Sequence, residues 1–213
     1  MTTQTGLIAD IVKSRDLTDR SAAQAAIFDA FAQAETLDAP VSPVWSTVGD
    51  EFQLVLPTVG AAVRTTAVVR LALPDGVDLR FGLGLGETWD VDSRGASPIQ
   101  DGPGWWAARR AIDEAHRRQD TGSPYLRSWF VDGTEPPAPT VERMVDAHLL
   151  LRDMTVSAMN PRQRRIALGT LMGRTQAELA AAEGITQSAV SQNLARSGAG
   201  ALVASIDLLR DLS

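Results

Sequence analysis

The chain has 213 residues, 44% of them hydrophobic, a formal net charge of −6 and no cysteine. This length and apolar content allow one large domain, or one domain with a small second one. The composition excludes disulfides, thiolate metal ligands and thiol nucleophiles, and two histidines are too few for a histidine-rich site. Any bound metal must be held mainly by oxygen, which favours Mg²⁺, Mn²⁺ or Ca²⁺.

No segment has the roughly 20 apolar residues that a membrane-spanning helix needs, and no secretory leader is recognisable. We therefore expect a cytoplasmic protein with no membrane partner. Residues 1–151 carry 13 basic and 21 acidic side chains, whereas residues 152–213 carry seven and five. The weakly basic last segment permits contacts with phosphate groups, while the negative charge of the whole chain argues against unspecific coating of nucleic acid.

The first part of the chain alternates apolar runs, which predict strands, with apolar residues at helical spacing, which predict helices. Gly49 permits a tight turn between the two middle strands and places Asp50 at its tip. The order strand, helix, strand, strand, helix, strand is that of the ferredoxin-like fold, in which helices cover one face of an antiparallel sheet. The predicted elements are 5–12, 21–34, 44–48, 52–56, 59–73 and 79–85.

The segment 88–104 is rich in Asp, Gly and Pro and predicts a loop, and 105–118 predicts a helix. The run Pro136-Pro137-Ala138-Pro139 is the expected boundary between two regions, and a long helix at 141–159 is expected to connect them. The sequence thus predicts an α+β protein. Its expected parts are a domain at 1–135, a connecting helix within 136–159 and an all-helical domain at 160–213.

Two aspartates lie in strand-like settings, Asp10 within Leu7–Val12 and Asp50 within Val48–Phe52. Two carboxylates on neighbouring strands can hold two divalent cations, which stabilise the attacking and leaving oxygens of phosphoryl transfer. On local sequence alone, Asp10 simply ending a strand and Asp50 making an Asx-type turn is the other interpretation. Glu51 is either a third metal ligand or an ordinary hairpin residue.

Polar and aromatic neighbours allow two interpretations each. The only lysine, Lys13, is followed by Ser14 and Arg15, and these residues either cradle a phosphate or form a solvated loop. Trp105 and Trp106 either stack on a purine or fill the core, and packing is the commoner role of tryptophan.

Four motifs, in order, resemble those of class III nucleotidyl cyclases. They correspond to the first metal motif, the second metal motif, an arginine-glycine strand and the helix that carries a transition-state asparagine and arginine. They are Ala9–Arg15, Val48–Phe52, Arg80–Glu87 and Gly102–Arg110. The resemblance covers roughly residues 5–120, and the run Asp-Gly-Pro-Gly-Trp-Trp-Ala-Ala-Arg is most similar to the SatD family.

The resemblance implies a cyclase-like palm that binds a purine nucleotide or cyclic nucleotide, with Mg²⁺ or Mn²⁺ at Asp10 and Asp50. It also implies a homodimer, because class III cyclases build their sites from two chains. Arg110 matches the phosphate-binding arginine by spacing, and Arg109 matches it with a shift of one residue. Two positions depart from the pattern: Trp106 replaces the asparagine, and Ser46 replaces the lysine that reads the purine. These departures favour a nucleotide sensor, with an active cyclase or another metal-dependent phosphoryl-transfer enzyme as the alternative.

The C-terminal segment has the pattern of a helix-turn-helix. Asn160-Pro161-Arg162-Gln163 predicts a helix start, Thr175–Glu178 forms a capping box, Gly184 supplies a turn and Thr186 begins another helix. The apolar or small residues at its expected core positions are Leu179, Ala180, Ile185, Val190 and Leu194.

This segment resembles sigma factor region four and related response regulators over about 40 residues. Polar residues early in the last helix can hydrogen-bond base edges, and arginines around them can contact phosphates. The predicted base contacts are Gln187, Ser188, Ser191 and Gln192, and the predicted phosphate contacts are Arg162, Arg164, Arg165, Arg174 and Arg196. We therefore expect a DNA-binding transcription regulator, and the alternative is a helical bundle used for dimerisation.

Overall fold

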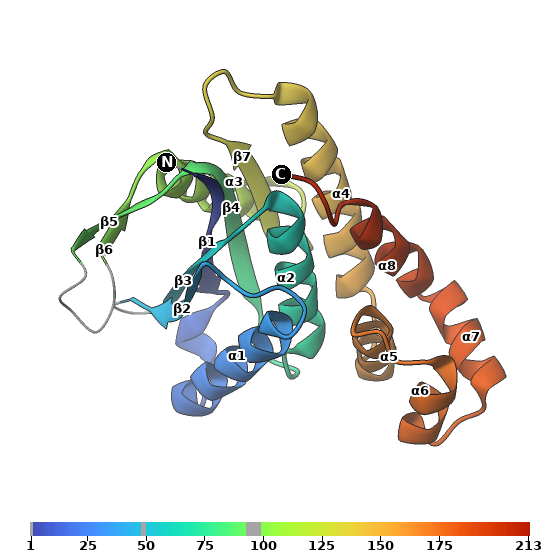
Figure 1. Ribbon diagram of the computed structural model, residues 1–213. Coiled ribbons are helices and arrows are strands. Elements are labelled where there is room, and N and C mark those ends of the chain that lie inside the picture. Colours follow the sequence, from blue (N-terminus) through green and yellow to red (C-terminus); the bar gives the residue numbers. More distant parts are fainter. Residues whose placement is uncertain (1, 48–49, 93–98) are drawn as a thin grey trace.

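A five-stranded sheet forms the centre of the protein (Figure 1). The computed structural model describes residues 2–47, 50–92 and 99–213. Its strand order is β2-β3-β1-β4-β7, and all neighbours are antiparallel except β4 and β7, which are parallel. The strands are β1 (Thr3–Ile11), β2 (Ser42–Ser46), β3 (Glu51–Leu56), β4 (Leu79–Glu87) and β7 (Ser128–Asp132). The predicted order of the first six elements is confirmed, whereas β7 was not predicted, and its parallel pairing makes the sheet mixed.

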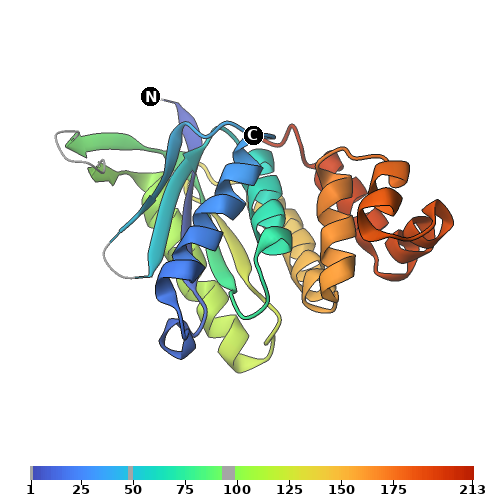
Figure 2. The same cartoon turned by 90° about the horizontal axis from the view of Figure 1, so that it is seen from below.

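Helices cover both faces of the sheet, so the expectation of one covered face is wrong. The helices α1 (Arg20–Glu35) and α2 (Val59–Ala72) lie on one face, and α3 (Pro103–Thr121) lies on the other (Figure 2). The physical reason lies in β4, where a Cβ atom at Gly82 or Gly84 would collide with the backbone of α3. Since neither glycine has a side chain, α3 packs directly on the strand.

The segment that was predicted as a loop contains a small two-stranded sheet, which extends from the rest of the molecule (Figure 1). It consists of β5 (Trp89–Asp92) and β6 (Ile99–Asp101), which are antiparallel. The turn glycine Gly49, which was predicted between β2 and β3, lies outside the described residues. The prediction of that turn therefore stays a prediction.

The long helix α4 (Pro139–Ser157) is packed along β7 and α2, and its role as the connection between two domains stays a prediction. Its inner side buries an ionic cluster in which Asp153 accepts hydrogen bonds from Arg70 Nη1 at 2.8 Å and from Arg152 Nη2 at 3.0 Å. Arg152 also donates to Thr66 Oγ1 at 2.7 Å. These buried charges are paired, as burial requires, and they fix α4 to α2.

Four short helices complete the chain: α5 (Pro161–Leu171), α6 (Gln176–Glu183), α7 (Gln187–Arg196) and α8 (Ala199–Leu208). The predicted helix starts are confirmed, because Asn160 and Thr175 each form a complete capping box. Gly184 ends α6 in the left-handed region with φ 65°, as a tight turn requires. The helix α8 was not predicted.

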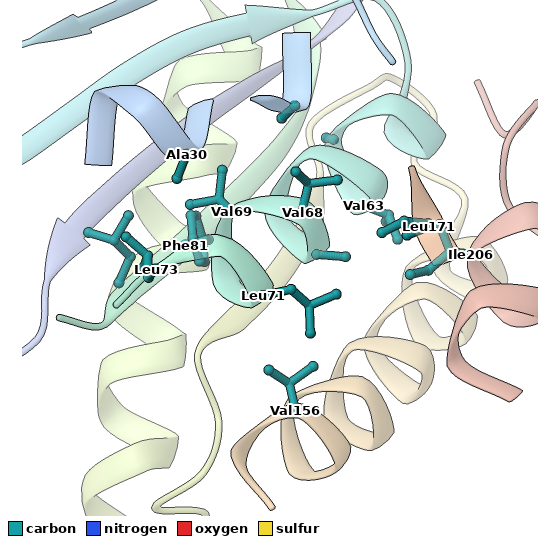
Figure 3. Close-up of a cluster of buried hydrophobic side chains, with 14 of the residues drawn as sticks. Ala30, Val63, Val68, Val69, Leu71, Leu73, Phe81, Val156, Leu171 and Ile206 are labelled. Carbon is teal, nitrogen blue, oxygen red and sulfur yellow. The ribbon is translucent and has the colours of Figure 1, made fainter. Parts of the chain in front are cut away.

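The core continues from the sheet into these last helices. Leu171 of α5 and Ile206 of α8 lie beside Val63 of α2 in one cluster of buried side chains (Figure 3). We call the sheet with α1–α4 the palm, and α5–α8 the helical region. The architecture is a mixed α+β fold with a helical region seated on α2, and the predicted division into three parts stays a prediction.

Candidate functional site

Three charged side chains lie in a row across the centre of the sheet. Asp10 of β1 is paired directly with Glu51 of β3 on one side and with Arg80 of β4 on the other. Directly paired residues of neighbouring strands point to the same face of a sheet. That face is the one covered by α3, because Gly82, two residues after Arg80, abuts α3. We call Glu51, Asp10 and Arg80 the charged row.

Arg80 holds the carboxylate of Asp10. Its Nη1 lies 3.0 and 2.9 Å from the two carboxylate oxygens, and its Nε and Nη2 donate to Gln119 Oε1 at 3.2 and 2.6 Å. The side chain of Arg80 is 7% exposed, whereas that of Asp10 is 33% exposed. Asp10 therefore has a buried counter-ion and still presents one edge to an incoming ligand.

The helix α3 holds Glu51 in a similar way. Arg109 approaches its carboxylate oxygens with Nη1 at 2.8 Å and Nη2 at 2.9 Å, and Gln53 Nε2 donates to it at 2.7 Å. The hydrogen bond with Glu51 raises the pKa of Arg109 above its ordinary value. Since the side chain of Arg109 is 49% exposed, it can exchange Glu51 for an anionic ligand.

Burial raises the pKa of Asp10 above its ordinary value, while Arg80 and His116 act in the opposite direction and Glu51 adds to the increase. The ionised form of Asp10 is therefore poorly solvated. A cation at its exposed edge would stabilise that form, because an opposite charge nearby favours ionisation.

Glu51 is the residue of β3 directly opposite Asp10. The described contact of Asp50 is made by its backbone carbonyl, which accepts a hydrogen bond from Ile11 N at 3.3 Å. Both Asp10 and Glu51 already have arginine partners, and in the described part of the chain no three His, Asp or Glu side chains could share a metal ion. Carboxylates that are already paired with arginines do not fit a two-metal centre. The binding of Mg²⁺ or Mn²⁺ at Asp10 and Asp50 stays a prediction.

A cavity of about 650 Å³ lies beside the charged row. Gln119 connects the two, because it lines the cavity and also holds Arg80. Pockets of this volume are typical of small-molecule sites. The basic side chains in its wall come from the end of β1, from α2, from the segment before β7 and from α5. They are Lys13, Arg70, Arg127 and Arg164, and the acidic ones are Asp16, Asp75 and Asp78.

The predicted phosphate-binding residues Lys13, Ser14 and Arg15 form a sharp turn at the end of β1. Lys13 has φ 55° and is the one non-glycine residue with positive φ among the residues that the structure describes. A left-handed backbone is unfavourable for lysine, and such conformations are often found at functional sites. Ser14 and Arg15 follow in a single 3₁₀ turn, so the three residues come together next to the cavity.

Arg110 follows Arg109 on α3, and no described ion pair joins it to the charged row. It lines a second cavity of about 600 Å³ together with Glu87, at the far end of β4. It also lines a cavity of about 440 Å³ together with Arg109 and Gln53, the two residues that hold Glu51. Of the two arginines predicted to bind phosphate, Arg109 is the one with a described contact to the charged row, and phosphate binding by either arginine stays a prediction.

The two tryptophans have different environments. Trp105 is buried and packs edge-on against Trp45, with ring centroids 5.9 Å apart, so its predicted packing role is confirmed. Trp106 is 54% exposed and its indole nitrogen donates to Asp101 Oδ1 at 2.8 Å. Of these two side chains, only that of Trp106 has an exposed ring surface that could stack on a ligand.

The predicted base-contacting residues of α7 are all exposed: Gln187, Ser188, Ser191 and Gln192. Arg174 and Arg196 are exposed on the same region. The other three predicted phosphate contacts are already engaged, since Arg162 and Arg165 lie 3.6 and 2.8 Å from Glu183, and Arg164 pairs with Asp75 of the palm. The predicted core residues of this unit lie inside, with Ile185 half-buried and the other four buried.

The sequence did not reveal the residues that organise the charged row. Arg80 was recognised only as part of a strand motif, and Gln53 and Gln119 carried no signal. Their roles follow from strand register and from the position of α3, which join residues up to 70 positions apart. The alternation of residues along β1 and β4 could have indicated that Asp10 and Arg80 face the same side, once their register was known.

These features define a mixed α+β protein with a charged row and a cavity beside the helical region. The chain belongs to the SatD family, whose model matches residues 5–204. Among the solved structures that match is the catalytic core of a rhodopsin-guanylyl cyclase with converted specificity in complex with ATPalphaS. It has 17% identity and a TM-score of 0.40, and the match covers 53% of this chain and 72% of that one. A score this low does not establish a shared fold. No curated protein matches significantly, and no described helix is long and apolar enough to cross a membrane.

Proposed function

We propose that the protein is a DNA-binding transcription regulator whose palm binds a purine nucleotide or a cyclic nucleotide. The observation that carries this proposal is the cavity of about 650 Å³, because its wall combines Lys13 of the palm with Arg164 of the helical region. A ligand in this cavity would contact both regions at once. Its presence could then be transmitted to the helix-turn-helix without a separate connecting element.

Recognition of phosphate is assigned to the turn after β1 and to α3. Lys13 and Arg15 are exposed cations at this turn, and Arg109, which lines a separate cavity on the other side of Asp10, can leave Glu51 to meet an anion. Cations of this kind form short, charge-assisted hydrogen bonds with phosphate oxygens. The purine part of the proposal rests on the resemblance to class III cyclases.

Sensing is favoured over turnover by the pairing within the charged row. Asp10 and Glu51 are each neutralised by an arginine, so they do not present the open carboxylates that hold catalytic metal ions. The residue at the position of the cyclase asparagine is Trp106, which cannot make the same hydrogen bonds to a ribose. Both features remove parts of the catalytic machinery while leaving cations for binding.

Binding to DNA is assigned to the exposed side of α7. Gln187 and Gln192 can form paired hydrogen bonds with adenine in the major groove, and Arg174 and Arg196 can contact the phosphates on either side. Recognition helices of this class read bases with residues near their N-termini, where Gln187 and Ser188 lie.

The alternative function is metal-dependent phosphoryl transfer of the cyclase type. The observation in its favour is the exposed edge of Asp10, since 33% of that side chain is accessible despite the contact with Arg80. In this alternative a nucleotide with its metal would exchange places with Arg80 at Asp10.

One experiment separates the two functions. The protein is titrated calorimetrically with ATP, GTP, cyclic AMP and cyclic GMP, with and without Mg²⁺ or Mn²⁺, and the same mixtures are assayed for pyrophosphate. Stoichiometric binding without product supports the sensor, whereas sustained release of pyrophosphate supports the enzyme. Absence of binding for all four ligands contradicts both.

Matched variants connect the result with the cavity. Lys13→Gln should weaken binding of the ligand, because it removes a cation from the wall. Arg210→Gln removes an equally positive, 56% exposed side chain near the C-terminus and should leave the affinity unchanged. Equal effects of both substitutions would indicate unspecific attraction by charge alone.

A further inference from the structure

The outer side of α4 carries an apolar stripe. Met144 and Leu151 are each 64% exposed, Met154 is 48% exposed, and Ala147 and Ala158 are exposed between and after them. Their separations are three, four, three and four residues, which is the spacing of a coiled-coil seam. At about 100° per residue, all five fall within a band of about 80° around the helix axis. We call these five residues the α4 face.

The α4 face is free of exposed charge. Between Met144 and Ala158 the charged residues of α4 are Asp146, Arg152 and Asp153, and all three point inward and are buried. The other exposed or half-buried positions of this stretch are occupied by His148, Leu150, Thr155 and Ser157. Exposed apolar patches normally mark interaction sites. A neutral stripe of this length on a protein with net charge −6 therefore indicates a binding surface.

We infer that the α4 face binds the α4 face of a second copy of this chain, with the two helices antiparallel. Charge is the first argument for this occupant. A copy of the same neutral face brings no like charges together, whereas a charged partner would find no counter-charge on this surface. A symmetric pair also needs one self-complementary patch and no further partner.

The sizes of the side chains are the second argument, and they set the direction. In the antiparallel arrangement Leu151 of each copy lies opposite Ala147 of the other, and Met144 lies opposite Met154. The large leucine then fills the space above the small alanine, as good packing between helices requires. In a parallel pair Ala147 would face Ala147 and leave a gap, and Leu151 would face Leu151.

The size of the contact predicts its strength. The stripe spans 14 residue steps, about 21 Å of helix, so the helix pair alone falls in the small class of interfaces, below about 1,200 Å². We therefore expect reversible self-association in the micromolar range rather than an obligate dimer. The α4 face contains none of the residues assigned to nucleotide binding or to DNA binding.

Sedimentation equilibrium over a range of micromolar concentrations tests the interface. The natural sequence should change from monomer to dimer, and Leu151→Asp should stay monomeric, because two new carboxylates would be placed in the seam. Leu208→Asp is the matched control, since Leu208 is 87% exposed on α8 and outside the α4 face. It should associate like the natural sequence. A natural chain that stays monomeric, or a Leu151→Asp variant that still dimerises, would overturn the proposal.

Disulfide cross-linking tests the direction of the two helices. The chain has no cysteine, so Ala147→Cys and Leu151→Cys each introduce a single thiol. An equimolar mixture of the two variants, one with an affinity tag, should form mainly the mixed disulfide on oxidation. Predominant cross-links of each variant to itself would overturn the antiparallel arrangement, and no cross-links in any sample would overturn the interface. Circular dichroism of each variant shows that it is folded.

Discussion

Arg80 occupies the position at Asp10 where a cation would be expected: its Nη1 lies within 3.0 Å of both carboxylate oxygens. Gln119 fixes the other side of the guanidinium, so this counter-ion is held by α3 as well as by β4. The charged row thus has its own positive charge in place of a metal ion. This relationship determines what substitutions at the site should do.

We predict that Arg80→Gln increases the affinity for Mn²⁺ by about tenfold or more, equivalent to about 1.4 kcal/mol. The substitution removes the competing guanidinium and leaves the carboxylate of Asp10 without a counter-ion. Calorimetric titration with Mn²⁺ measures the effect. The double variant Arg80→Gln with Asp10→Asn should lose the gain, and a gain that persists in the double variant would show that the metal binds elsewhere.

The buried ionic cluster on α4 gives a prediction about stability. Although burial acts to raise the pKa of Asp153, Arg152 and Arg70 hold it below the usual range, so the group is ionised in the folded protein. Asp153→Asn would leave two buried guanidinium groups without a carboxylate, and we expect the free energy of unfolding to fall by about 3–5 kcal/mol. Urea denaturation followed by circular dichroism measures it.

Asp75→Asn is the control for that measurement. Asp75 also pairs with an arginine, Arg164, but its side chain is 71% exposed, and exposed ion pairs contribute at most about 1 kcal/mol. If the two substitutions destabilised the protein equally, the buried cluster would not have the structural role inferred for it.

A pH dependence is expected from Asp146, because burial raises its pKa to about 7. An aspartate of the unfolded chain has a pKa of about 3.9. Between these values the folded state holds a proton that the unfolded state has lost, so stability falls as the pH rises from about 4 to about 7, and is level above that. The neighbouring Glu142 strengthens this effect, and Arg118 opposes it.

Asp146→Asn should remove this contribution and raise the midpoint of thermal unfolding at about pH 8 more than at about pH 5. The asparagine oxygen can still accept the hydrogen bond that Phe130 N donates at 2.9 Å, and it carries no charge to bury. Asp207→Asn, at a half-exposed position on α8, is the control. An equal change at both pH values would contradict the assignment to Asp146.

Local patterns predicted much of this fold, and long-range pairing explains the rest. The helices α1, α2 and α5–α7 have clear periodicity or capping residues, and their predicted positions agree with the structure within a few residues. The strand β7 is a five-residue run, Ser128–Asp132, and its burial depends on α3 and α4. A pattern that short does not distinguish a strand from a loop.

The same distinction between local patterns and long-range pairing applies to the residues of the candidate site. The turn after β1 was recognisable because Lys13, Ser14 and Arg15 are adjacent in the sequence. The contacts of Asp10 with Arg80 and of Arg109 with Glu51 join residues 70 and 58 positions apart, and they depend on register and on the close approach of α3 at Gly84. No local pattern specifies either, so the sequence could not indicate that Glu51 lies directly opposite Asp10.

The last prediction concerns the coupling between nucleotide and DNA. Arg164 of α5 pairs with Asp75 and lines the cavity together with Lys13, so a phosphate in the cavity would compete with Asp75 for this arginine. We expect nucleotide to change the affinity for a selected DNA site, and DNA to change the affinity for nucleotide by the same factor, typically about 5- to 150-fold. Arg164→Gln should reduce that factor towards one and weaken nucleotide binding, because it removes a cation from the cavity wall, while the affinity for DNA without nucleotide changes little. Gln187→Ala with Gln192→Ala should instead abolish sequence-specific DNA binding and leave nucleotide binding intact, because both side chains are exposed on α7 and neither lines the cavity.

Fluorescence anisotropy with labelled DNA, in the presence and absence of each nucleotide, measures the DNA affinity of each variant and the coupling factor. Unchanged coupling in Arg164→Gln would exclude this arginine as the link, and equal DNA affinity with and without every nucleotide would refute the sensor itself.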